Sequence, residues 1–67
     1  MTGKQFEAAL DKLRMTKLSI AVLFDVDVRT IHRWLRRDGV SGAEAIVLRI
    51  LLAGKITLPQ LRKIAAQ

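Results

Sequence analysis

Three arginines and a histidine recur between Val28 and Arg37 at a spacing that could bind anions. Each residue of an α-helix turns about 100° around the axis, so Arg29, His32, Arg33 and Arg36 fall on one side. A guanidinium group donates paired hydrogen bonds to phosphate oxygens or to the O6 and N7 atoms of guanine. This face therefore predicts binding of a polyanion.

The opposite side of the same segment is apolar and can hold the helix on a core. Ile31, Trp34 and Leu35 fall on this side. Asp27 precedes the segment as a predicted N-cap, and Asp38-Gly39 ends it by supplying a glycine that accepts left-handed backbone. We expect a helix over residues 28–37 with its cations exposed.

These side chains also have plainer interpretations. The arginines could form a solvated face, but no Asp or Glu lies within residues 28–37, which favours an external anionic partner. Trp34 could stack on a base, but its place opposite the arginines favours a core anchor. For His32, contact with a base edge or phosphate and simple surface exposure both stay open.

A second helical pattern covers residues 17–24 and is separated from the first only by Asp25-Val26-Asp27. The residues expected to face the core are Ile20, Ala21 and Phe24, and Val26 is the expected buried plug of the turn. Leu18 and Val22 fall on the remaining side, where they either cover the first helix or a neighbouring side chain, or form an exposed patch for a partner.

Residues 16–34 resemble the helix-turn-helix of lambda-repressor/Cro-like regulators. That family's pattern, roughly T-Q-x-x-x-A-x-x-L-G-V-S-x-x-T-V-x-R-W, becomes T-K-L-S-I-A-V-L-F-D-V-D-V-R-T-I-H-R-W here. Ala21 stands where the two helices approach closely, and Asp27 replaces the capping serine. Asp25 replaces the usual turn glycine and tolerates left-handed backbone better than most residues. Lys17 replaces the glutamine that contacts a phosphate.

The resemblance implies that residues 28–37 enter the major groove of DNA. Arg29 and Arg33 are then placed for guanine, Arg36 and Arg37 for phosphates, and Thr30 for a phosphate at the flank. The complete predicted DNA-binding set is Lys17, Arg29, Thr30, His32, Arg33, Arg36 and Arg37. The chain is also similar to very short phage and anti-CRISPR-associated autorepressors, which implies a phage or mobile-element setting.

Length and composition narrow the classes further. A chain of 67 residues forms one domain, here residues 1–67, and buries too little surface to be more than marginally stable alone. It has no cysteine, a single histidine and a net charge of +6, which exclude disulfides and a zinc cage and favour nucleic acid as a partner. No apolar run reaches the roughly 20 residues of a membrane span, so a cytoplasmic location is expected.

The remaining helices are predicted around residues 2–13, 41–53 and 57–66. Capping-box spacing marks the start of each, at Thr2-Gln5, Ser41-Glu44 and Thr57-Gln60. The first has the core-facing spacing Phe6, Ala9, Leu10 and Leu13, with Glu7 and Asp11 as solvated charges rather than a catalytic pair. The second is apolar nearly all round, with Ala43, Ile46, Val47 and Ile50 on one face and Leu48, Leu51 and Leu52 on the other.

Such a helix must be covered on more than one side, and the last helix is too short to be stable undocked. We therefore expect residues 41–66 to contribute to a homodimer. The predicted interface residues are Leu48, Leu52, Leu58, Leu61 and Ile64.

Together these patterns predict an all-α domain of five short helices with a lambda-repressor-like helix-turn-helix. The expected function is that of a transcriptional repressor that binds double-stranded DNA sequence-specifically. It is expected to bind an inverted-repeat operator as a homodimer and to regulate its own expression. The alternative is an antitoxin-like or adaptor module that binds protein without specific DNA readout. Neither paired acids, a nucleophile with a base, nor metal ligands emerge, so no enzyme, cofactor or small-molecule ligand is expected.

Overall fold

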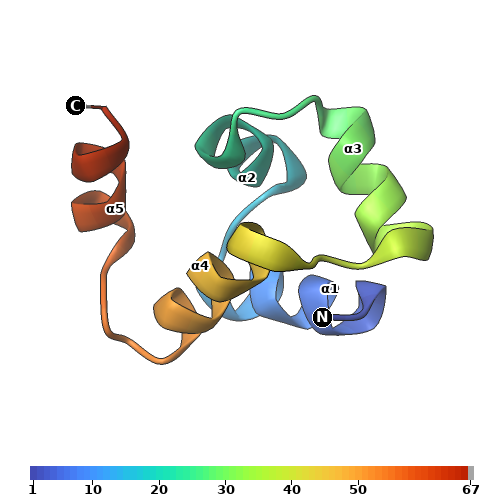
Figure 1. Ribbon diagram of the computed structural model, residues 1–67, viewed down its shortest axis with the longest axis horizontal. Helices are drawn as coiled ribbons and strands as arrows, with labels where there is room; N and C mark the ends of the chain where they lie inside the picture. The colour runs from blue at the N-terminus through green and yellow to red at the C-terminus, as the bar shows by residue number, and fades with distance from the viewer. Residues whose placement is uncertain (67) are drawn as a thin grey trace.

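The computed structural model describes residues 1–66, which form helices joined by short turns (Figure 1). The helices are α1 (Gly3–Leu13), α2 (Lys17–Phe24), α3 (Val28–Arg33), α4 (Gly42–Leu52) and α5 (Leu58–Ala65). A π-helical turn, η1 (Trp34–Asp38), continues α3 without a break. The predicted all-α class with five helices is confirmed, and the third helix ends in a wider turn than expected.

Side-chain caps fix where most of the helices begin. The predicted capping boxes Thr2–Gln5 and Thr57–Gln60 are both present. A third box, Thr16–Ser19, begins α2 and was not predicted, because Ser stands where Glu or Gln is usual. The box predicted at Ser41–Glu44 is wrong. Gly42 opens α4 with a φ of 64°, and Ser41 makes no side-chain capping hydrogen bond.

The core lies where α1, α2, α3 and α4 meet. The α1 helix packs against η1 and α4, and α2 packs against α3. The buried residues of the core cluster are Phe6, Leu10, Ile20, Ala21, Ile31, Val40, Ala45 and Leu48. The predicted inward faces of α1 and α2 are confirmed, since Phe6 and Ile20 are fully buried and Phe24 packs on the cluster.

The α4 helix packs on the core through the leucine side. Leu48 is fully buried and Leu51 nearly so, whereas Ile46 is 55% and Ile50 40% exposed. Because apolar residues surround the helix, their periodicity could not fix its orientation. The prediction that Leu48 contacts a second subunit is therefore wrong, since its side chain lies inside the protomer.

The start of the chain is tied to the connection between η1 and α4 by two backbone hydrogen bonds. The Met1 amino group donates to the Val40 carbonyl at 2.9 Å, and the Val40 N–H donates to the Met1 carbonyl at 2.7 Å. Gly39, with a φ of 67°, lies directly against the Met1 carbonyl, and Gly3 lies directly against the Leu35 carbonyl. Because neither glycine has a Cβ, the backbone of η1 and the residue after it can lie directly against the start of α1.

The α5 helix stands apart from the rest, at the end of the long axis opposite α3 (Figure 1). None of its side chains is fully buried, and Ile64 is 57% exposed. No helix in the described part of the chain has both the length and the apolarity needed to cross a membrane.

Candidate nucleic-acid interface

The turn between α2 and α3 is fixed by backbone geometry and one side-chain cap. Asp25 adopts the expected left-handed conformation, with φ 55° and ψ 49°, and ends α2. The Val26 N–H donates to the Ala21 carbonyl at 3.0 Å, and Val26 is partly buried on the core. The Asp27 carboxylate accepts from the Arg29 N–H at 2.8 Å and begins α3 as predicted. The two helices are thus held at a fixed mutual orientation.

The back of α3 is clamped to the core by aromatic contacts. Ile31 is fully buried. The Trp34 ring lies with its centroid 6.0 Å from that of Phe6 at 67°, and 6.2 Å from that of Phe24 at 60°. The contact with Phe6 is edge-on, a geometry that stabilises aromatic pairs beyond the area they bury. The interpretation of Trp34 as a core anchor is confirmed.

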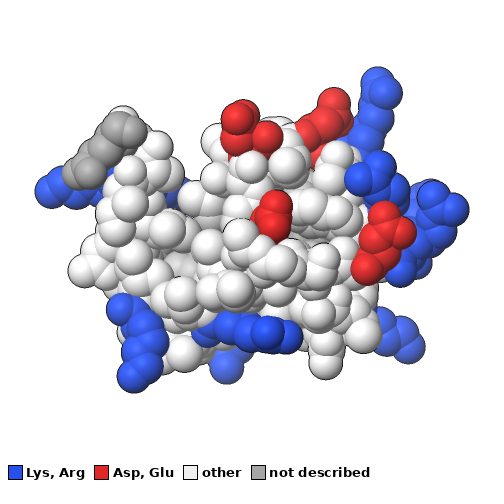
Figure 2. Space-filling view, viewed as in Figure 1, with Lys and Arg blue, Asp and Glu red and all other residues white. Residues whose placement is uncertain are grey.

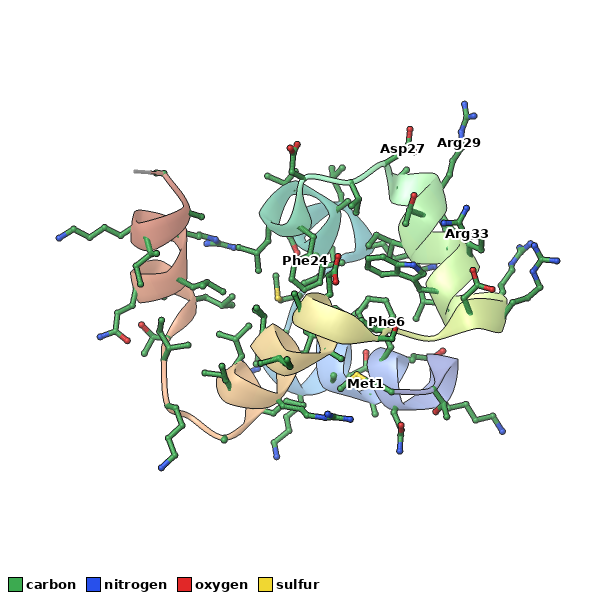
Figure 3. All side chains as sticks on the ribbon, in the orientation of Figure 1. Met1, Phe6, Phe24, Asp27, Arg29 and Arg33 are labelled. Carbon is green, nitrogen blue, oxygen red and sulfur yellow. The ribbon has the colours of Figure 1, made fainter. Side chains whose placement is uncertain are left out.

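The outer side of α3 and η1 carries the cations. The side chains of Arg29, His32, Arg33, Arg36 and Arg37 are exposed and line one shallow hollow of about 460 Å³. Figure 2 shows basic side chains gathered at the edge of the molecule that α3 and η1 form in Figure 1. Figure 3 shows Arg29 projecting outward from the first turn of α3. A hollow walled by guanidinium and imidazole groups favours an anionic occupant.

A second hollow, of about 850 Å³, extends this surface to the start of α2. Lys17 lines it together with His32 and Arg36, which also line the first hollow. Glu7 and Asp11 of α1 also line this hollow, so acidic side chains border the cationic surface there. The predicted residue Lys17 is thus brought beside the cations of α3.

Thr30 is the one predicted DNA-binding residue that lines neither hollow. Its side chain is half-buried, whereas the other six predicted residues are exposed. The structure therefore brings Lys17, Arg29, His32, Arg33, Arg36 and Arg37 onto one surface and leaves Thr30 at its margin.

An acidic partner for one of these arginines lies just past the predicted segment. The Nε atom of Arg33 is 3.0 Å from an Oδ2 oxygen of Asp38, and both side chains are about half exposed. The sequence pattern assigned Asp38 only to the end of the helix. Residues five apart lie about 140° apart around a regular α-helix, so the pairing needed the wider turn of η1.

Leu18 and Val22 are 65% and 73% exposed, so most of the surface of each side chain is left uncovered by its neighbours. They line a largely apolar groove of about 640 Å³ between α2 and α5, which Arg62 and Ala65 line from the other side. The exposed-patch alternative for these two side chains therefore fits the structure.

Of the five predicted dimer residues, the four that follow Leu48 in the chain remain at least partly accessible to solvent. Leu52, Leu58 and Leu61 are partly buried and Ile64 is exposed. Leu48 is the exception described above.

Residues 1–66 contain no group of three or more His, Asp or Glu side chains placed to hold a metal ion. Comparison of the chain with family models, with curated proteins and with solved structures finds no match.

Proposed function

We propose that this protein is a sequence-specific transcriptional repressor that binds double-stranded DNA through α3. One observation carries the proposal: five exposed basic side chains line a single hollow on a helix whose back is locked by Ile31 and Trp34. A rigid helix with one cationic face has the size and chemistry of a major-groove reader. The short turn from α2 to α3 adds support, because lambda-repressor/Cro-like regulators resemble this arrangement.

The contacts divide by position along the helix. Arg29 projects from the first turn of α3, the part of a recognition helix that reaches deepest into the groove, and is assigned to a base edge. Arg33 lies one turn further and is assigned to a second base. Arg36 and Arg37 belong to η1 and are assigned to phosphates, as is Lys17 at the start of α2.

A second copy of the chain is the proposed partner of α5. This helix has an apolar stripe that its own protomer covers only in part, with Leu58 and Leu61 half-buried and Ile64 exposed. Two copies related by a two-fold axis would place two α3 helices on an inverted repeat, with half-sites one helical turn of about 34–36 Å, or a multiple of it, apart. Occupancy of a promoter would exclude polymerase, and control by concentration suits autorepression in the cytoplasm of a bacterial or phage-infected cell.

Selection of bound duplexes from a random pool tests the proposal directly. Enrichment of a palindromic consensus supports both sequence-specific binding and two-fold symmetry. Enrichment of a single half-site would contradict the proposed homodimer. A pool that stays random would contradict the proposed sequence-specific repressor.

The exposed groove between α2 and α5 favours a second candidate, a protein-interaction module of the antitoxin or adaptor kind. Its apolar lining includes Leu18 and Val22, the two most exposed large apolar side chains among the described residues. A protein that is not retained by duplex DNA at modest salt would favour this candidate over the repressor.

A further inference from the structure

The ion pair between Arg33 and Asp38 restricts how Arg33 can present its hydrogen-bond donors. The carboxylate oxygen of Asp38 lies 3.0 Å from Nε of Arg33. A guanidinium group can offer a pair of donors either from its two terminal nitrogens or from Nε and one terminal nitrogen. With Nε held by the carboxylate, the terminal pair is the one left to face a ligand.

The π-helical turn is what makes this pairing possible. The Gly39 N–H donates to the Trp34 carbonyl at 2.9 Å, five residues back, and this wide turn reduces the angular separation of Arg33 and Asp38. Trp34 and Val40 anchor the turn at its two ends, since Trp34 packs against Phe6 and Val40 is buried. The carboxylate is therefore carried by a fixed piece of backbone.

The helix dipole and affinity for phosphates both disfavour an acid at this place. A negative charge at the C-terminal end of a helix opposes the helix macrodipole. A carboxylate paired with Arg33 also repels the phosphates that the arginines of this surface would attract. What it does provide is a preferred orientation for one guanidinium group, which lowers the entropy lost when that group binds.

We infer that Asp38 is a positioning residue that holds Arg33 for end-on, two-donor recognition of guanine and keeps it away from phosphates. The inference rests on the proposed function and names the residue that orients one of the side chains assigned to a base. It assigns Asp38 no contact with DNA. Its effect on specificity and its effect on affinity then have opposite signs, which a merely structural role would not produce.

The test measures binding of wild type, Asp38→Asn, Asp38→Glu and Arg33→Ala to the selected duplex and to duplexes altered at each base pair. The base pair read by Arg33 is the one at which Arg33→Ala abolishes the preference. Fluorescence anisotropy at several salt concentrations gives affinity and its salt dependence. Asp25→Asn is the matched control, because it removes an exposed carboxylate elsewhere and asparagine also accepts the left-handed conformation of that position.

We expect wild type to prefer guanine at that position by on the order of ten- to a hundred-fold, the range of a two-donor arginine contact. Asp38→Asn should reduce the preference to about threefold or less and raise affinity for random duplex. The freed guanidinium can then reach a phosphate, which steepens the slope of log affinity against log salt by about 0.9. Asp38→Glu should retain most of the preference, and Asp25→Asn all of it. Unchanged thermal stability of Asp38→Asn shows that the fold is intact.

An Asp38→Asn protein that keeps the full guanine preference overturns the inference while leaving the repressor in place. Equal loss of preference in Asp38→Asn and Asp25→Asn overturns it too, because the effect would then be general electrostatics. If the wild-type protein binds all duplexes with equal affinity, both the proposed function and the inference are contradicted.

Discussion

Trp34 meets Phe6 edge-on, with ring centroids 6.0 Å apart and ring planes at 67°, and so joins the end of the proposed recognition helix to α1. Phe6 is fully buried at the centre of the core. The helical segment that carries the cations of the outer face is therefore anchored by a contact on its opposite side. Loss of this contact should disturb folding and binding together.

Trp34→Ala should lower the free energy of unfolding by about 3 kcal/mol, the low end of the range for large aromatic side chains of a core, because Trp34 is only partly buried. For a domain of this size such a loss is a large part of the total stability. Trp34→Phe keeps an aromatic contact and should cost clearly less. Urea denaturation followed by circular dichroism measures both, and equal stability of Trp34→Ala and wild type would contradict the anchor role.

Gly39→Ala should be destabilising for two separate reasons. Gly39 has φ 67° and ψ −165°, a backbone region that is essentially restricted to glycine and costs other residues about 1–3 kcal/mol. An added Cβ would also collide with the Met1 carbonyl, which pairs with Val40.

Gly54→Ala is the matched control for this change. Gly54 also has a positive φ, of 72°, but an added Cβ would meet nothing within 4 Å. We expect Gly39→Ala to lower the thermal midpoint more than Gly54→Ala does. Equal shifts for the two variants would show that backbone conformation alone, and not the approach to Met1, matters at Gly39.

The sequence predicted best where one face of a helix is apolar and the other polar. Phe6, Ala9 and Leu10 of α1 are buried as their spacing indicates. On α4 apolar residues surround the helix, so the pattern could not show that Leu48 faces the core and Ile46 the solvent. Helix orientation there depends on which side fills the space beside α1, which is a property of the packed fold.

The candidate interface shows the same division between local and long-range information. The exposed face of Arg29 and its neighbours follows from helical periodicity and a fixed N-cap at Asp27. The pairing of Arg33 with Asp38 does not, because a regular helix would separate them. It depends on the π-helical turn, which lies between Trp34 and the Val40 backbone that pairs with Met1.

Arg29→Ala and Arg37→Ala should weaken DNA binding in different ways. Arg29, in the first turn of α3, is assigned to a base edge, so its loss should cost about 1–3 kcal/mol on the selected duplex and relax one position of the consensus. Arg37, in η1, is assigned to a phosphate, so its loss should weaken all duplexes alike and reduce the salt slope by about 0.9.

Each of these two variants removes one positive charge, so each serves as the electrostatic control for the other. Gel-shift titrations on the selected and a scrambled duplex at several salt concentrations separate the two patterns. If Arg29→Ala weakens both duplexes equally, the base contact at Arg29 is wrong and the side chain serves only as a charge.

Ile64→Glu should convert the proposed dimer into monomers without unfolding the protomer. Ile64 is 57% exposed on α5, so a carboxylate at this position stays hydrated in the free protomer and is penalised only where a second subunit covers it. The equivalent change on α4, Ile46→Glu, alters a side chain of similar exposure outside the proposed interface and is the control.

Sedimentation velocity reports the oligomeric state, and titration with full operator and half-site duplexes reports the linkage between assembly and binding. Ile64→Glu should sediment as a monomer and lose the gain in affinity that two linked half-sites provide, whereas Ile46→Glu should behave as wild type. Leu48→Ala, by contrast, should lower the free energy of unfolding by about 2–5 kcal/mol, because it opens a cavity in the protomer core. Dissociation caused by Ile46→Glu but not by Ile64→Glu would move the proposed interface from α5 to the exposed side of α4.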